Sequence, residues 1–291
     1  MRPRRNPEPV AVMLYSAGHL DGLQRPPVAA LRAAARFVDI IVSAAALIFL
    51  APLMILIAAA ILIEGGRPIL FSQLRVGHRG RYFRMHKFRK FHERAFQAGL
   101  SLTMEDDPRL SAVGRTLART KLDELPQLWN VLKGDMSIVG PRPESLDFQD
   151  CFDGPYRAVL EHKPGIFGPS QVLFRNEPSL YSKHSNPEQF YREVLFPLKA
   201  HLDLSYFGDR TLLGDIGWAV RGGFAVLRWS SLVEQGPALV KAAESAIGEA
   251  RVAGSDLAPQ IALLLHRRRI LEIVRQSGTE VPAFAARERA G

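Results

Sequence analysis

An uncharged apolar stretch of 24 residues, 40–63, is the feature that most constrains how this chain can fold. A helix needs about 20 such residues to cross a hydrocarbon core of about 30 Å, so the stretch is long enough to enter a membrane. It is too long and too far from the N-terminus for a cleaved signal peptide, and no convincing small-residue cleavage site follows it. We therefore expect it to remain in the mature protein as a membrane segment.

Pro52 divides this stretch into two halves of 12 residues. Each half would rise about 18 Å as a helix, which is too short to cross a membrane alone. A proline inside a helix removes one backbone hydrogen bond and kinks or breaks the helix. Arginines and lysines crowd both flanks of the stretch, although such residues normally mark the cytoplasmic end of a membrane segment.

Two membrane arrangements follow from these features. In the first, the helix enters the membrane, breaks at Pro52 and returns to the same leaflet, so that both basic flanks lie in the cytoplasm. In the second, one helix spans the membrane with a tolerated proline kink, as membrane helices often do. Charge symmetry and length favour the re-entrant helix and leave the spanning helix open.

The charge balance favours a polyanionic partner. The chain has 38 Lys and Arg against 29 Asp and Glu, which gives a formal net charge of +9. Nucleic acid, anionic lipid and a phosphorylated substrate would all suit this charge. Cys151 is the sole cysteine, which excludes an intrachain disulfide and a multi-cysteine zinc site.

The segment after the apolar stretch predicts a β-hairpin. Two β-favouring runs, 68–73 and 81–88, are separated by a segment that contains Gly77 and Gly80. Glycines between two such runs are typical of the turn of a hairpin.

Two short helices are expected next. Residues 113–120 predict the first, and the second begins near Leu125 and ends at Gly134, a typical stop residue. The apolar face expected for the second helix comprises Leu125, Leu128, Trp129 and Leu132.

The C-terminal half predicts further helices. Residues 191–226 indicate amphipathic helical pieces with breaks near Gly208 and Gly214. The basic amphipathic helix expected at 261–274 would lie on an anionic leaflet or pack against the catalytic domain or a second subunit. The first 30 residues, rich in Arg and Pro, are expected to form a disordered basic arm.

Asp123 and Glu124 are adjacent carboxylates just ahead of the second short helix. A lone Asp in such a place is ordinarily a helix cap. Here, however, several cations and a proline-rigid loop at 140–143 lie near the pair in the sequence. The nearby cations are Arg109, Arg115, Arg119, Lys121 and Arg142. A pair of acids among many bases suggests a nucleophile or a metal ligand.

This region has the residue types that phosphoryl transfer requires. A carboxylate can form an aspartyl phosphate, Arg can bind phosphate in a bidentate fork, and Mg²⁺ held by carboxylates and a diphosphate can neutralise charge. Lys87 and Arg89, at the end of the expected hairpin, are either further phosphate-binding cations or a solvated basic face. The sequence has no P-loop, dinucleotide-binding glycine motif, zinc-protease motif or nucleophile elbow.

The run KLDELPQLWNVLKGDMSIVGPRPE at 121–144 closely resembles the bacterial sugar transferase family, the monotopic phosphoglycosyl transferases. Arg36 and Asp39 at the start of the apolar helix, the hairpin, the DPR at 107–109 and the KPG at 163–165 support the resemblance. It covers about residues 31–226.

The resemblance implies a polyprenyl-phosphate sugar-1-phosphate transferase. In the family, the Asp of the dyad attacks the β-phosphate of a UDP-sugar, UMP leaves, and a polyprenyl (undecaprenyl) phosphate takes the phosphosugar, with Mg²⁺ required. Asp123 would then be the nucleophile, and Asp123 and Glu124 the catalytic pair and metal ligands. The residues expected to bind substrate are Lys87, Arg89, Arg109, Arg119 and Arg142.

Three departures from the family pattern are visible. Ala51 precedes Pro52 where Ser is common, and Ala118 stands where many members have Arg, which makes Arg119 the candidate substitute. The family's common KPGITGLWQV reads KPGIFGPSQV at 163–172, so the sugar or acceptor specificity is expected to differ.

The resemblance and the residue patterns together predict an α+β protein. A re-entrant helix-break-helix would carry a small, mainly helical cytoplasmic catalytic domain with a β-hairpin, followed by a helical C-terminal tail. The expected divisions are 1–30, 31–66, 67–230 and 231–291.

The expected location is the cytoplasmic face of the bacterial inner membrane, where the product would begin glycoconjugate or exopolysaccharide assembly. Membrane lipid, a second copy of the chain or downstream glycosyltransferases are the expected partners, and nucleic acid is not. The alternative is a membrane-tethered basic adaptor or nucleic-acid-binding protein without catalysis, which leaves the Asp123–Glu124 pair unexplained.

Overall fold

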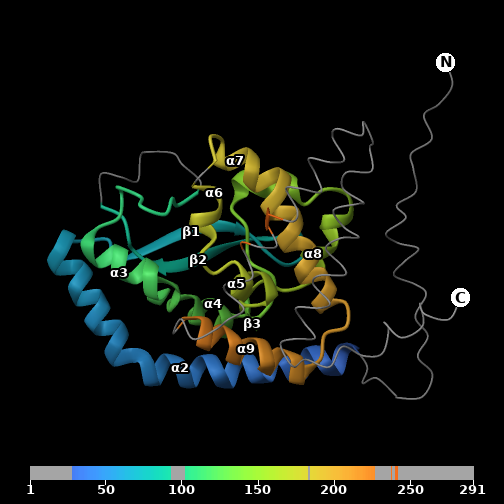
Figure 1. Cartoon of the computed structure of the whole chain (residues 1–291). Coiled ribbons are helices and arrows are strands. Elements are labelled where there is room, and N and C mark those ends of the chain that lie inside the picture. The colour runs from blue at the N-terminus through green and yellow to red at the C-terminus, as the bar shows by residue number, and fades with distance from the viewer. Residues whose placement is uncertain (1–27, 93–101, 183, 227–236, 238–239, 242–291) are drawn as a thin grey trace, which may run out of the picture.

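The computed structural model describes residues 28–92, 102–182, 184–226, 237 and 240–241. The chain within these ranges is a mixed, mostly helical α+β structure, as predicted (Figure 1). Most of the predicted N-terminal arm and nearly all of the predicted tail, including the helix expected at 261–274, lie outside the described residues.

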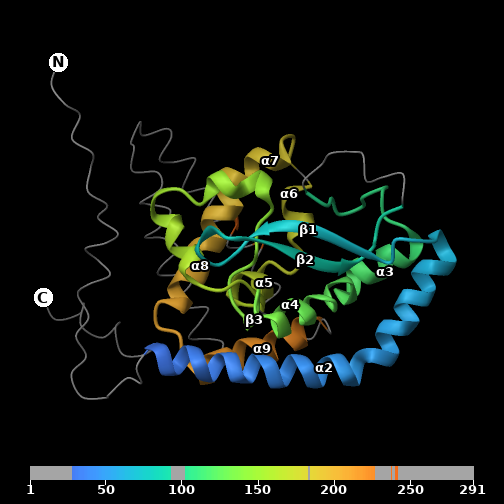
Figure 2. The same cartoon turned by 180° about the vertical axis from the view of Figure 1, so that it is seen from behind.

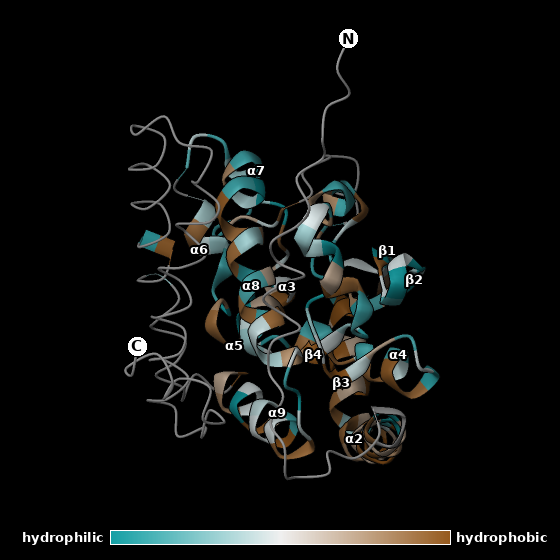
Figure 3. Cartoon of the chain, turned by 90° about the vertical axis from the view of Figure 1, so that its right-hand side faces the viewer, coloured by the Kyte–Doolittle hydropathy of each residue, from teal (hydrophilic) through white to brown (hydrophobic). Residues whose placement is uncertain are grey.

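One long helix, α2 (Val28–Gly65), contains the whole apolar stretch. By length and composition it could cross a membrane, and few of its residues are buried in the protein. Figures 1 and 2 show α2 running along one edge of the molecule and then bending away along a second edge. In Figure 3, α2 is seen nearly end-on and is coloured mostly hydrophobic.

The helix is bent but not broken. Pro52 lies inside α2, which continues on both sides of it, so the predicted separation into two helices is wrong. A proline removes one backbone hydrogen bond and displaces one carbonyl, which bends a helix whose neighbouring turns keep their own bonds.

A β-hairpin follows α2, as predicted. Strand β1 (Leu70–Val76) pairs with antiparallel β2 (Tyr82–Phe88), and a short turn of helix, η1 (His78–Gly80), connects them. The first strand begins and ends later than the predicted 68–73, because pairing with β2 continues to Val76.

The two predicted short helices are present as α3 (Ala112–Thr120) and α4 (Gln127–Lys133). Between them lies one 3₁₀ turn, η3 (Leu122–Glu124). Gly134 ends α4 with a φ of 100°, a left-handed conformation that favours glycine, as the sequence indicates.

A second, parallel sheet joins β3 (Ser137–Val139) to β4 (Gly165–Phe167). The C-terminal part is helical, with α8 (Phe196–Phe207) and α9 (Leu212–Val226) as its longest members. The remaining short helices are η4 (Leu146–Cys151), η5 (Gly154–Glu161), α5 (Pro169–Leu173), α6 (Glu177–Tyr181), α7 (Pro187–Phe190) and the π-helical turn η6 (Tyr191–Leu195).

One of the two predicted breaks in this region is present. Gly208 separates α8 from α9, but Gly214 lies inside the first turn of α9. The N–H of Gly214 donates to the Thr211 hydroxyl at 3.0 Å, a side-chain cap that allows the helix to start before the glycine.

Both ends of α2 are held by the same folded body. Near the N-terminal end, Arg36 donates to the Leu132 carbonyl at 2.7 Å, and Asp39 accepts from the Ile138 N–H at 2.8 Å. At the other end, Glu64 accepts from the Val113 N–H at 3.1 Å. Apolar contacts reinforce this second anchor through Ile57, Ile61, Phe88 and Leu117, which form one buried cluster.

Candidate functional site

Asp123 lies in the tight turn η3 between α3 and α4 and is 2 % exposed. Lys121, with a left-handed φ of 60°, ends α3 and directs the chain into this turn. Pro126, not Asp123, is the N-cap residue of α4, so the carboxylate is not the ordinary helix cap. Its Oδ1 atom is buried and has no hydrogen-bond partner among the described residues.

Glu124 faces two cations from distant parts of the chain. The Nζ atom of Lys87, on β2, lies 2.8 Å from its Oε1, and Nη2 of Arg142 lies 3.6 Å from the same oxygen. Burial by itself would raise the pKa of Glu124, but the charges of Lys87, Arg142 and Lys121 outweigh burial and hold that pKa well below its ordinary value. Glu124 is therefore ionised at neutral pH.

Two further lysines act on the dyad. Burial lowers the pKa of Lys90 to about 8, although the negative charge of Asp123 opposes this shift. Burial also lowers the pKa of Lys121, against the opposing charge of Glu124. Both lysines therefore contribute to the positive field around the two carboxylates.

The sequence singles out Lys87 and Arg89 as basic residues at the end of the expected hairpin. Lys87 lies in β2, which ends at Phe88, and Arg89 follows directly after the strand. Arg89 is buried and donates to the carbonyls of Gly66 at 3.0 Å and Arg67 at 3.3 Å, at the C-terminal end of α2. These contacts place the Arg89 guanidinium at the C-terminal end of α2, where it binds the last carbonyls.

The described contacts of Arg109 and Arg119 are with residues other than Asp123 and Glu124. Arg109 forms a close pair with Asp107, with Nη2 and Oδ2 2.6 Å apart. The Arg119 side chain is exposed, and its carbonyl accepts from Nη2 of Arg175 at 2.9 Å. Among the five predicted substrate-binding residues, the described contacts bring Lys87 and Arg142 to Glu124.

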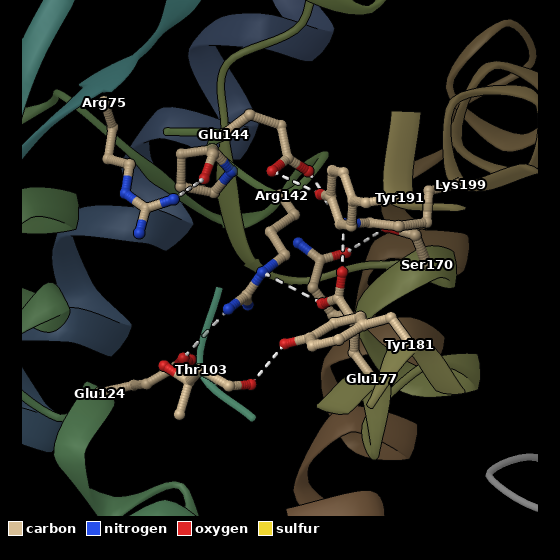
Figure 4. A network of polar contacts seen from close by, with 12 residues as sticks. Arg75, Thr103, Glu124, Arg142, Glu144, Ser170, Glu177, Tyr181, Tyr191 and Lys199 are labelled. Carbon is tan, nitrogen blue, oxygen red and sulfur yellow. Dashed lines mark hydrogen bonds and ion pairs between the residues drawn. The ribbon is translucent and has the colours of Figure 1, made fainter. Parts of the chain in front are cut away.

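A buried polar network lies behind Arg142 (Figure 4). Arg142 lies 3.8 Å from Glu177, and Lys199 binds both Glu177 and Glu144. The Tyr191 hydroxyl donates to Glu144 at 2.6 Å. Glu144 ends the GPRPE run, whereas Glu177, Tyr191 and Lys199 lie in the helical region that follows, where the sequence predicted no site residue.

The Asp123–Glu124 dyad has the ligands for a metal ion that is held partly by the protein and partly by substrate phosphates. Within the described residues, no group of three or more His, Cys, Asp or Glu could bind a metal ion. Mg²⁺, however, is commonly held by one or two carboxylates together with substrate phosphates and water. Asp123, with a buried oxygen atom that lacks a partner, and Glu124 beside it fit this kind of site.

The arrangement combines an available carboxylate oxygen with several cations. Such cations can bind a polyanionic substrate and stabilise the charge that develops at a phosphoryl group. A carboxylate beside them can act as a nucleophile toward phosphorus. The geometry therefore suits phosphoryl transfer.

Comparison with known proteins agrees with this chemistry. The chain is 41 % identical over 143 residues to a UDP-N-acetylgalactosamine-undecaprenyl-phosphate N-acetylgalactosaminephosphotransferase of Aeromonas hydrophila, covering 47 % of this chain and 33 % of the relative. It is 39 % identical over 140 residues to a UDP-glucose:undecaprenyl-phosphate glucose-1-phosphate transferase of Caulobacter vibrioides, covering 47 % of this chain and 52 % of the relative.

An exopolysaccharide production protein, ExoY of Rhizobium meliloti, is 31 % identical over 172 residues, which cover 54 % of this chain and 76 % of the relative. By contrast, the chain matches about a third of the length of the Aeromonas protein. The family model described as bacterial sugar transferase matches residues 30–228, which include all but the first two residues of α2, the dyad and the network behind Arg142. The chain therefore belongs to the bacterial sugar transferase family.

Proposed function

We propose that this protein transfers a sugar 1-phosphate from a UDP-sugar to undecaprenyl phosphate and thereby begins the assembly of an exopolysaccharide or glycoconjugate. One observation carries the proposal: Asp123 has a buried oxygen atom without a partner in the described structure, beside a carboxylate held by Lys87 and Arg142. The printed names of the relatives from Aeromonas and Caulobacter, which pair a UDP-sugar with undecaprenyl phosphate, support the two substrates.

In the first displacement, a carboxylate oxygen of Asp123 attacks the β-phosphorus of the UDP-sugar. A bond forms between this oxygen and phosphorus, and the bond from phosphorus to the bridging oxygen of the diphosphate breaks. UMP leaves with that oxygen and its electron pair. The sugar phosphate stays on Asp123 as a mixed anhydride.

In the second displacement, a phosphate oxygen of undecaprenyl phosphate attacks the same phosphorus atom. The bond to Asp123 breaks, and the carboxylate is regenerated. The product is an undecaprenyl diphosphate sugar. Because the attacking oxygen is already ionised at neutral pH, this step needs no general base.

The cations around Asp123 bind and orient the phosphates. Lys87 and Arg142 hold Glu124 ionised, and Arg142 is accessible enough to bind a phosphate oxygen as well. Mg²⁺ bound by Asp123, Glu124 and the diphosphate would neutralise charge on the phosphates and the leaving UMP.

The membrane placement that fits this function is re-entrant, on the cytoplasmic face of the inner membrane. Both ends of α2 contact the same folded body, through Arg36 and Asp39 at one end and Glu64 at the other. A straight helix of 38 residues would extend about 57 Å and carry its ends to opposite sides of a membrane. The bend, the two anchors and the basic flanks together support re-entry.

The covalent intermediate provides the test of this function. With a suitable UDP-sugar and Mg²⁺ but no polyprenyl phosphate, the protein should release about one UMP per active site and then stop. Mass spectrometry should find the phosphosugar on the peptide that contains Asp123. Asp123→Asn should lose both the burst and turnover, because an amide at this position is a far weaker nucleophile.

Asp150→Asn is a matched control, because it makes the same change at an exposed carboxylate paired with Arg192. This variant should keep the burst and the turnover. An adduct on Asp123→Asn, or UMP release that requires polyprenyl phosphate, would contradict the two-step mechanism. Absence of UMP release from a full panel of UDP-sugars would contradict the transferase function itself.

A further inference from the structure

Arg142 lies in the middle of a row of ion pairs whose charges alternate in sign. Figure 4 shows this row from Glu124 to Glu144. The row extends from the hairpin through η3 and the loop after β3 to α6 and α8. Its members, in order, are Lys87, Glu124, Arg142, Glu177, Lys199 and Glu144.

The links of this row differ in length. Nζ of Lys199 lies 2.9 Å from Glu144 and 3.0 Å from Glu177, which are hydrogen-bond distances. The guanidinium of Arg142 lies 3.6 Å from Glu124 and 3.8 Å from Glu177, beyond hydrogen-bond distance. The Arg142 side chain is also 27 % exposed, more than any other member of the row. Arg142 is thus the member held most loosely.

Lys199 remains charged in a buried place. Its side chain is 4 % exposed. Burial alone would lower the pKa of Lys199, but the charges of Glu144 and Glu177 outweigh burial and raise it. The ammonium group also lies 2.7 Å from the Tyr191 hydroxyl, which itself donates to Glu144. Lys199 therefore neutralises much of the charge of Glu177 through Oε1, whereas Arg142 faces Oε2.

We infer that Lys199 is a positioning residue for Arg142: by sharing the charge of Glu177, it keeps this carboxylate from binding Arg142 tightly and leaves the guanidinium available to the diphosphate of the donor. The inference rests on the proposed function. Without Lys199, an unshared Glu177 would attract Arg142 into a close, bidentate pair. That pair would have to break before Arg142 could bind phosphate, and donor affinity would fall.

The test measures UDP binding by calorimetry in the full-length protein, together with KM and kcat for UMP release. Lys199→Met should weaken UDP binding about 10-fold to 100-fold, the range expected for one charge-assisted contact. KM for the donor should rise more than kcat falls. Adding Glu177→Gln to Lys199→Met should restore most of the UDP affinity, because the carboxylate that captures Arg142 has lost its charge. A purely structural role would predict no such recovery.

A second pair of variants covers the case in which Lys199→Met does not fold, since it leaves Glu144 buried without its cation. Lys199→Met with Glu144→Gln removes both partners, and adding Glu177→Gln to this pair should again restore UDP affinity. Glu188→Gln, which removes an exposed carboxylate paired with Arg192, is the control and should bind UDP normally.

Unchanged UDP affinity in the Lys199 variants would overturn the inference, as would a loss that Glu177→Gln does not reverse. A wild-type protein that binds no UDP and releases no UMP would instead contradict the proposed function. The two failures are therefore distinguishable.

Discussion

At the scale of single residues, the site depends on basic side chains whose pKa is lowered by burial. Lys90 is the clearest case, because burial lowers its pKa to about 8 beside Asp123. Below that pH its ammonium group is charged and attracts phosphate, and above it the group becomes neutral. We therefore expect UMP release to fall as the pH rises through about 8, a limb that a pH profile of kcat/KM would measure.

Lys90→Arg tests this assignment, because a guanidinium keeps its charge over the whole accessible range. The alkaline limb should move to higher pH in this variant. The free energy of unfolding should change in the opposite direction to activity. Between about pH 8 and 10.5, Lys90 keeps its proton in the unfolded chain but has lost it in the folded protein. The folded state therefore becomes more stable as the pH rises through this range. An alkaline limb that stays in place in Lys90→Arg would contradict the assignment.

Arg142 carries a second prediction at this scale. Arg142→Ala should reduce kcat/KM by about 30-fold to 1,000-fold, the effect of about 2 to 4 kcal/mol for one contact aimed at the transition state. Arg142→Lys should lose less, because a point charge remains although the bidentate geometry is gone. Arg192→Ala, at a half-buried arginine paired with the exposed Asp150, should leave kcat/KM nearly unchanged. Equal losses in Arg142→Ala and Arg192→Ala would refute a specific role for Arg142.

At the scale of elements, the loop that carries Arg142 depends on the close approach of β3 and β4. Gly165 of β4 lies so near the end of β3 that a Cβ atom on it would come within 2.0 Å of the Gly140 nitrogen. The Gly165 N–H also donates to the Pro141 carbonyl at 2.9 Å. A side chain at position 165 would therefore displace the backbone just before Arg142.

Gly165→Ala should consequently lower both the thermal unfolding temperature and the rate of UMP release. Gly223→Ala is the matched control, because a Cβ atom there would meet nothing within 4 Å. Gly223 lies inside α9, where alanine favours the helix by roughly 1 kcal/mol over glycine. The control should be as stable as the wild type or more so. A Gly165→Ala variant with wild-type stability and rate would show that the loop tolerates the displacement.

At the scale of the whole molecule, α2 determines how the catalytic part meets the membrane. If the helix re-enters, Ala33 before the apolar stretch and Leu70 after it lie in the same compartment. Both side chains are exposed. Single cysteines at these two positions, in a Cys151→Ser background, should react equally with a membrane-impermeant thiol reagent from the cytoplasmic side. Labelling from opposite sides of the membrane would establish a spanning helix and refute re-entry.

The sequence by itself determined the features that depend on near neighbours. The continuous apolar stretch of α2, the hairpin, the glycine stop of α4 and the dyad before it all arise from residues within a few positions of one another. Such local signals act through backbone hydrogen bonds and conformational preference, which a sequence pattern expresses directly. Two local predictions were wrong. Pro52 was expected to end a helix, but α2 continues through it. Gly214 was expected to break a helix, but Thr211 caps α9 ahead of it.

The tertiary structure alone decided which side chains meet at the site. On α4, Trp129 was expected on the buried face but is 53 % exposed, whereas Asn130 is fully buried and binds the Arg84 carbonyl of the hairpin. Lys87 reaches Glu124 across 37 positions of sequence, and Lys199 reaches Glu144 across 55. These contacts follow from how separate elements pack, because the orientation of each element is set by the surface it buries against the others and not by its own residue pattern.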